Sequence, residues 1–201
     1  MVIQNCAADA PLLLLNLYNI MMFFSPGYNV NGKFEFRDLV PVGIAALVVI
    51  IDQLTKLWIM ANFALHEQQN VIPGLFDLVY VTNTGAAFGF LAGSKSWLRH
   101  FFFIGVAIIA LVVIAYAYGH LKKQGRIFAY SLGLIGGGAV GNLIDRLRFG
   151  SVVDFLDFYL GSYHWPAFNA ADSAITVGVG LFFLGTLLQH MEEKRQLKIK
   201  K

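Results

Sequence analysis

The stretch FNAADSAI, residues 168–175, leads directly into the apolar run TVGVGLFFLGTLL, residues 176–188. A run of this kind predicts a transmembrane helix, which needs roughly 20 predominantly apolar residues. Asp172 stands where the run begins, and a charge beside hydrocarbon is costly unless it has a role there. Aspartate is also favoured at helix N-termini, where its carboxylate accepts backbone N–H bonds. Taken alone, Asp172 therefore fits helix capping as well as chemistry.

The composition of the whole chain indicates a membrane protein. Of its 201 residues 57% are hydrophobic and 13% are charged, and the mean hydropathy is +0.63. Soluble domains carry about 25% charged residues. The net charge of +3 does not predict a nucleic-acid partner, because the basic residues gather at the chain ends and in one loop. The single cysteine, Cys6, excludes an internal disulfide, and the scattered histidines lack HExxH-like spacing, so we expect no metal and no other cofactor.

Four segments have enough apolar length to cross a bilayer, and they cover residues 39–60, 97–118, 127–144 and 173–191. Ten lysines and arginines fall on the side that holds both termini, and five fall on the other side. The positive-inside rule then predicts cytoplasmic termini, and it puts Asp52, Asp154 and Asp172 on the outer side. We divide the chain into an extension of unknown role (1–38), a membrane domain (39–193) and a basic cytoplasmic tail (194–201).

The connection between the first two spans has its own structure. Residues 75–81, LFDLVYV, are rich in β-branched and aromatic side chains and predict a strand of a small outer sheet. Residues 83–91, NTGAAFGFL, predict a short interfacial or re-entrant helix. In the third span, glycines recur every four residues, a spacing that favours close helix packing: Gly133, Gly137 and Gly141. The expected fold is an all-α membrane protein with four transmembrane helices, a small extracytoplasmic β-sheet and a short interfacial helix.

Several polar residues lie at the outer ends of the spans. Asp52 and Lys56 are spaced i, i+4, which favours a structural ion pair on one helix face. Asp154 lies in the half-buried extended or turn segment GSVVDFLDF, where Asp157 has the same formal chemistry. A solvated loop carboxylate is the alternative interpretation of Asp154.

The segment GNLIDRLRFG, residues 141–150, adds Asn142, Asp145 and Arg146 where the third span ends. Taken alone, these residues fit an interfacial anchor with an internal polar network. Together with the other acids they indicate chemistry based on two carboxylates, since no serine–histidine pair, cysteine nucleophile or metal cluster accompanies them. Two close carboxylates share a proton, so that one takes a proton from water while the other polarises a carbonyl. A proton-coupled carrier and a structural subunit are the alternatives.

Five motifs occur in the order found in lipoprotein signal peptidase, also called signal peptidase II, and the chain resembles that family over residues 39–193. The motifs are DQLTK (52–56), NTGAAF (83–88), GNLIDR (141–146), VVDF (152–155) and FNAADSAI (168–175). The resemblance implies that Asp154 and Asp172 are the catalytic pair, and it favours Asp154 over Asp157. It implies substrate-binding or supporting roles for a further set: Asp52, Lys56, Asn83, Gly85, Ala86, Asn142, Arg146 and Asn169.

The resemblance also implies an activity and a place in the cell. The protein would be a monomeric aspartic endopeptidase of the bacterial inner membrane, with its active site at the outer leaflet. It would remove the signal peptide from diacylglyceryl-modified prolipoproteins by cutting before the lipidated cysteine. Its partners would be these lipid-modified substrates and membrane lipid. Residues 1–38 lie outside the resemblance.

Overall fold

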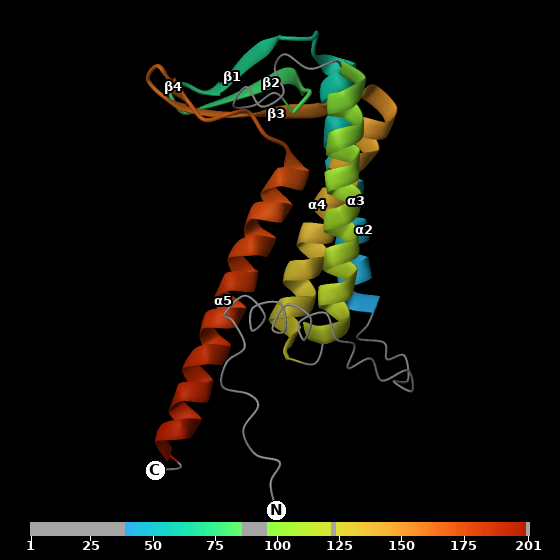
Figure 1. Ribbon diagram of the computed structural model, residues 1–201. Helices are drawn as coiled ribbons and strands as arrows, with labels where there is room; N and C mark the ends of the chain where they lie inside the picture. The colour runs from blue at the N-terminus through green and yellow to red at the C-terminus, as the bar shows by residue number, and fades with distance from the viewer. Residues whose placement is uncertain (1–38, 86–95, 122–123, 200–201) are drawn as a thin grey trace, which may run out of the picture. The chain divides into compact units, whose positions relative to one another are not determined.

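The computed structural model describes residues 39–85, 96–121 and 124–199. Within these ranges, four helices are long and apolar enough to cross a membrane, which confirms the four predicted spans (Figure 1). They are α2 (Val40–Asn62), α3 (Ser96–Leu121), α4 (Arg126–Phe149) and α5 (Ala170–Ile199). The last helix continues well beyond its predicted end at residue 191, because the polar sequence that follows remains helical.

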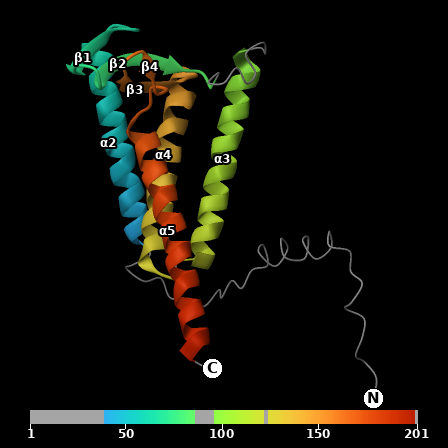
Figure 2. The ribbon, with the colours of Figure 1, turned by 90° about the vertical axis from the view of Figure 1, so that its left-hand side faces the viewer.

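Helix α4 packs against each of the other three helices, and Figure 2 shows α2 and α3 on its two sides. Its glycines permit this packing, as predicted. A Cβ atom added to Gly137 would lie 2.8 Å from the Cα atom of Ala45 on α2, and one added to Gly133 would lie 2.8 Å from the Pro41 carbonyl oxygen. A Cβ on Gly141 would lie 2.5 Å from the Asp52 Oδ2 atom. A larger residue at Gly133 or Gly137 would therefore force α2 and α4 apart, and one at Gly141 would displace the Asp52 carboxylate.

A four-stranded antiparallel sheet with the order β1-β2-β3-β4 lies at one end of the helices (Figure 1). The strands are β1 (Gln68–Ile72), β2 (Phe76–Asn83), β3 (Val152–Leu160) and β4 (Tyr163–His164). The strand predicted for residues 75–81 is confirmed as β2. The segment expected to be an extended or turn segment is the full strand β3, which pairs with β2 so that Asp154 lies opposite Val81. This pairing fixes Asp154 at the junction of sheet and helices.

The short helix expected over residues 83–91 differs at its start, because Asn83 is the last residue of β2. From Ala86 onward this segment lies outside the described residues. Below the sheet, Ile59 and Phe63 at the end of α2 pack with Phe155 of β3 in a small apolar cluster. This cluster joins α2 to the sheet beside a group of buried charged and amide side chains.

Candidate active site

Four elements that are far apart in sequence bring their polar side chains together beneath the sheet. The contributing segments are the second half of α2, the last third of α4, strand β3 and the first turn of α5. We call this set the polar network, and its members are Asp52, Gln53, Lys56, Asn142, Asp145, Asp154, Asn169 and Asp172. Most of these side chains are buried, so each needs a hydrogen-bonding or charged partner within the protein.

The first turn of α5 is closed by a reciprocal cap between Asn169 and Asp172. The Asp172 backbone N–H donates to the Asn169 Oδ1 atom at 3.0 Å, and the Asn169 N–H donates to the Asp172 Oδ2 atom at 3.3 Å. Asn169 thus occupies the position before the helix, and Asp172 is its third residue, the arrangement of a capping box. The capping interpretation predicts Asp172 as the N-cap, but the N-cap is Asn169, three residues earlier, and Asp172 completes the capping box from within the first turn.

The amide of Asn169 also reaches the carboxylate of β3. Its Nδ2 atom donates to the Asp154 Oδ1 atom at 2.6 Å and lies 3.2 Å from the Val153 carbonyl oxygen. Burial, and to a smaller extent the negative charge of Asp172, raises the pKa of Asp154 to about 7. Hydrogen bonds from Asn169 and Asn83 and the charge of Lys56 act in the opposite direction on this pKa. Asp154 therefore exchanges a proton near neutral pH.

Asn142 of α4 links the second carboxylate to the same network. Its Nδ2 atom donates to the Asp172 Oδ1 atom at 2.7 Å. Its Oδ1 atom accepts from the Asn169 Nδ2 atom at 3.2 Å and from the Lys56 ammonium at 3.1 Å. The two asparagines therefore bridge Asp154 and Asp172, so that a proton change at one acid is felt at the other.

The ion pair predicted between Asp52 and Lys56 is confirmed at 2.9 Å. Lys56 also pairs with Asp145 at 2.8 Å, a contact that sequence analysis missed. Both acids hold backbone groups of the segments that carry Asp172 and Asp154: Asp52 accepts the Ala171 N–H at 2.9 Å, and Asp145 accepts the Val153 N–H at 3.1 Å. The buried ion triad thus fixes α5 and β3 upon α2 and α4.

Gln53 was also missed. Its Nε2 atom donates to the Asp145 Oδ1 atom at 2.9 Å and lies 3.2 Å from the Asp52 Oδ2 atom. The only indication of Gln53 in the sequence is weak, because it is a glutamine beside Asp52 near the end of an apolar span. The spacing of Asn142 and Asp145 was a stronger signal, because residues three apart lie on one face of a helix.

The other predicted residues surround the network. Arg146 donates to the Asn142 carbonyl oxygen at 3.2 Å, and its guanidinium lies 5.5 Å from the ring centre of Phe103. The Gly85 N–H donates to the Asn83 Oδ1 atom at 2.8 Å. Gly85 has φ of 85°, and a Cβ added there would overlap the Phe103 ring, so both backbone and space require glycine. Ala86 lies outside the described residues.

A cavity of about 280 Å³ opens onto this group. Its lining residues come from β2, β3 and the segment before α5, and they are Val81, Thr82, Asn83, Thr84, Asp154, Pro166 and Ala167. Asp157 faces elsewhere, since its carboxylate lies 2.9 Å from the His164 Nδ1 atom on the neighbouring strand. Among the described residues, no three histidine, cysteine or acidic side chains are grouped as a metal site would require.

The chain is similar to known membrane peptidases over most of its length. A family model for signal peptidase (SPase) II matches residues 44–188. The lipoprotein signal peptidase of Syntrophus aciditrophicus (strain SB) is 47% identical over 150 residues, which are 75% of this chain and 92% of that protein. The lipoprotein signal peptidase of Syntrophotalea carbinolica is 52% identical over 150 residues, which are 75% of this chain and 91% of that protein.

A solved structure agrees with these sequence comparisons. It is a bacterial membrane enzyme determined by the in meso method at 1.9 Å resolution, and it is 36% identical to this chain with a TM-score of 0.64. The likeness covers 73% of this chain and 92% of that one. The chain therefore belongs to the signal peptidase II family.

Proposed function

We propose that this chain is an aspartic endopeptidase that cuts diacylglyceryl-modified prolipoproteins just before the lipidated cysteine, with Asp154 and Asp172 as its catalytic pair. Membership of the family makes the chain a membrane-bound signal peptidase. The observation that carries the catalytic proposal is the pair of asparagines between the two acids. They hold one carboxylate on β3 and one on α5 within a single hydrogen-bonded unit, as shared-proton chemistry requires.

In this mechanism Asp154 starts protonated and Asp172 starts ionised. The Asp172 carboxylate takes a proton from water as the water oxygen attacks the scissile carbonyl carbon, and Asp154 gives its proton to the carbonyl oxygen. The resulting neutral diol collapses when Asp172 returns its proton to the departing nitrogen and Asp154 takes a hydroxyl proton. The C–N bond breaks without an acyl-enzyme, and both acids regain their starting states.

The raised pKa of Asp154 supports this division of roles. A carboxyl group with a pKa of about 7 is half protonated at neutral pH and largely protonated in mildly acidic solution, as a proton donor must be. Asp172 lies at a helix N-terminus, where the backbone N–H groups and the helix dipole stabilise negative charge. The two environments thus favour one neutral acid and one carboxylate.

The supporting residues have three kinds of role in this proposal. Asn142 and Asn169 orient the acids, while Asp52 and Lys56 hold the elements that carry them. Asn83, Gly85, Ala86 and Arg146 shape the cleft for the substrate. The 1–38 extension and the 194–201 tail are accessory to a membrane domain at 39–193, and the enzyme acts as a monomer.

We also propose an orientation in the bacterial inner membrane. Basic residues concentrate toward both termini, which favours a cytoplasmic location for them. The sheet and catalytic pair then lie at the outer leaflet, where the signal segment enters from the bilayer and its lipid stays in the membrane. Asp154 lies in the sheet at one end of the helices and Asp172 in the first turn of α5, instead of at mid-span, which favours a peptidase over a proton-coupled carrier.

The test is cleavage of a lipidated preprolipoprotein by the purified full chain in lipid. Asp154→Asn and Asp172→Asn should each abolish signal-peptide release, and the double variant should be no worse than either single one. Asp157→Asn is the matched control, because its carboxylate pairs with His164 outside the polar network. Near-normal turnover by Asp172→Asn would reduce that residue to a helix cap and refute the proposal.

A further inference from the structure

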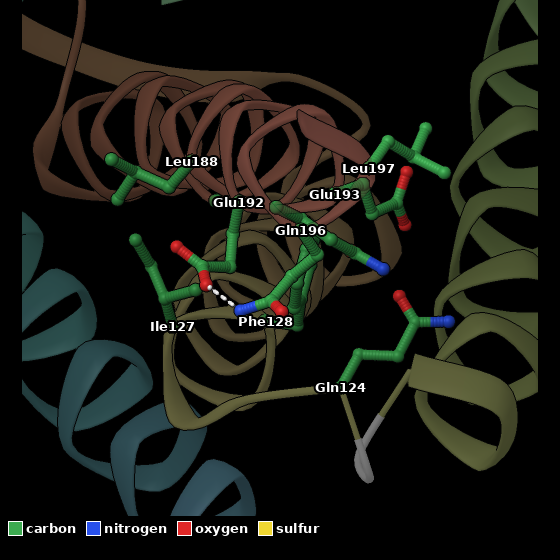
Figure 3. Close-up of a pocket in the computed structure, with 10 residues that line it drawn as sticks. Gln124, Ile127, Phe128, Leu188, Glu192, Glu193, Gln196 and Leu197 are labelled. Carbon is green, nitrogen blue, oxygen red and sulfur yellow. Dashed lines mark hydrogen bonds between the residues drawn. The ribbon is translucent and has the colours of Figure 1, made fainter. Parts of the chain in front are cut away.

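A groove of about 730 Å³ lies between the start of α4 and the later part of α5 (Figure 3), at the end of these helices that is remote from the sheet (Figure 1). Its apolar floor includes Ile127, Phe128 and Leu188. Gly185 marks the point where the two helices still touch, since a Cβ added there would lie 2.8 Å from the Ile127 Cγ2 atom. Helix α4 begins at Arg126, so α5 continues past the start of α4, and the groove opens there.

The mouth of the groove is acidic, although the sequence around it is basic. Glu192 and Glu193 line it, whereas Lys194 and Arg195 do not. The Gln196 Nε2 atom donates to the Glu192 Oε1 atom at 2.8 Å, which turns Glu192 across the groove (Figure 3). No lysine or arginine in the described ranges forms an ion pair with either glutamate. The groove therefore suits a ligand with an apolar body and a cationic end.

The groove also lies at a defined distance from the catalytic pair. Glu192 follows Asp172 by twenty residues on the same helix, which is about 30 Å along the axis at 1.5 Å per residue. This length equals the hydrocarbon thickness of a typical bilayer, about 30 Å. A ligand that reaches from one site to the other would thus cross the whole membrane.

A signal peptide has these dimensions and this charge. It starts with a positively charged segment that is followed by about 7–15 apolar residues and a short stretch before the cleavage site. The apolar part covers about 10–22 Å as a helix, and each extended residue before the scissile bond adds about 3.3 Å. With the scissile bond at Asp154 and Asp172, the cationic segment falls near the depth of Glu192.

We propose that this groove binds the cytoplasmic end of the substrate's signal peptide. The first apolar residues of the peptide lie on Ile127, Phe128 and Leu188, and the lysines or arginines before them pair with Glu192 and Glu193. This inference rests on the proposed function, and it adds a second recognition site to the same substrate. Anchoring the cationic end fixes how far the peptide reaches toward the catalytic pair, so the groove acts in binding and not in chemistry.

The experiment compares two lipidated preprolipoproteins, one with two lysines in its N-terminal segment and one with two glutamines there. The double substitution Glu192→Gln/Glu193→Gln should raise KM for the lysine substrate by roughly three- to tenfold, which is the loss of affinity expected for two partly exposed ion pairs. The kcat should not change, and the glutamine substrate should show no effect. Lys194→Gln/Arg195→Gln is the matched control, because these neighbours lie outside the lining and should not raise KM.

Charge reversal and direct binding complete the test. Glu192→Lys/Glu193→Lys should raise KM for the lysine substrate further. A substrate that carries two glutamates in its N-terminal segment should restore a low KM with this variant. An equal rise in KM for lysine and glutamine substrates, or no rise at all, would overturn the proposal; the former would indicate an occupant such as an amine-bearing phospholipid. Affinities of the two isolated signal peptides are measured in parallel, so that failure to cleave refutes the proposed function while the groove is still judged by binding.

Discussion

Asn169 and Asp172 accept each other's backbone N–H groups in the first turn of α5, and the same Asn169 side chain donates to Asp154 at 2.6 Å. A helix cap and the link between two acids are thus one structural unit. A capping role for Asp172 does not exclude a chemical one. Its Oδ2 atom accepts the Asn169 N–H of the cap, while its Oδ1 atom accepts from Asn142.

The raised pKa of Asp154 predicts how activity depends on pH. The proposed donor is protonated below a pH of about 7 and loses its proton above it. We therefore expect kcat/KM to decline as pH rises through about 7, measured with lipidated substrate at constant ionic strength. A rate that keeps rising up to pH 9 would show that Asp154 does not act as the acid.

The same shift predicts a stability effect. The folded state favours the protonated form of Asp154, so its contribution to stability is fully present below the ordinary carboxyl pKa of 3.8 and is lost progressively as pH rises from there to about 7. Asp154→Asn is neutral at every pH, so it should raise Tm by several degrees at pH 8.5, by less at pH 5, and have little effect at or below pH 4. Asp157→Asn serves as the control in the same melting series, and an equal response in both variants would contradict the assignment.

Asn169 should be the position where stability and turnover respond most differently to different substitutions. Asn169→Ala removes the cap and leaves buried acceptors unpaired, which costs about 2–4 kcal/mol of unfolding free energy. Asn169→Asp keeps a capping oxygen but adds a negative charge against Asp154. It should retain more helix stability than Asn169→Ala and still lose cleavage, as measured by denaturation and product release.

Lys56 neutralises two buried carboxylates, so its loss should be severe. Lys56→Met leaves Asp52 and Asp145 without their cation, and breaking a buried pair in this way costs about 3–5 kcal/mol. We expect a large fall in Tm and little folded protein in membranes. Lys194→Met, on the exposed part of α5, is the control; a loss below about 1 kcal/mol for Lys56→Met would mean that water reaches the triad.

Two glycines provide a matched test of helix packing. A Cβ on Gly137 would lie 2.8 Å from the Ala45 backbone, whereas nothing lies within 4 Å of a Cβ on Gly43. Gly137→Ala should destabilise the protein by about 1–3 kcal/mol. Gly43→Ala should be neutral or stabilise it by up to about 1 kcal/mol. Equal melting temperatures for the two variants would show that α2 and α4 adjust to the added methyl group.

Much of the fold could be predicted because each span carries its own signal. The apolar runs and the β-branched residues of β2 depend only on local sequence, and they are confirmed. The strand β3 is less clear from sequence, since its alternation is imperfect and its pairing with β2 joins residues about 70 to 80 positions apart. Ordered motifs pointed to Asp154 and Asp172, and the structure brings the elements that carry them together.

Contacts between helices could not be predicted in the same way. The pair between Lys56 and Asp145 depends on how α2 and α4 are rotated about their axes, which the glycine contacts determine and no single segment reveals. Asn169 was expected to support the site, but its double role as cap and bridge requires the position of β3 beside α5. Tertiary packing, not local propensity, sets these relationships.

The distribution of the polar network over the chain also sets an order of assembly during synthesis. Asp52, Lys56 and Asn142 leave the ribosome before Asn169 and Asp172. Until α5 has entered the bilayer, Asp52 lacks the Ala171 N–H and Asn142 lacks the Asp172 carboxylate. A nascent chain with three helices in place therefore carries an incomplete polar network, and the hydrogen bonds that link its two halves form only when the last helix arrives.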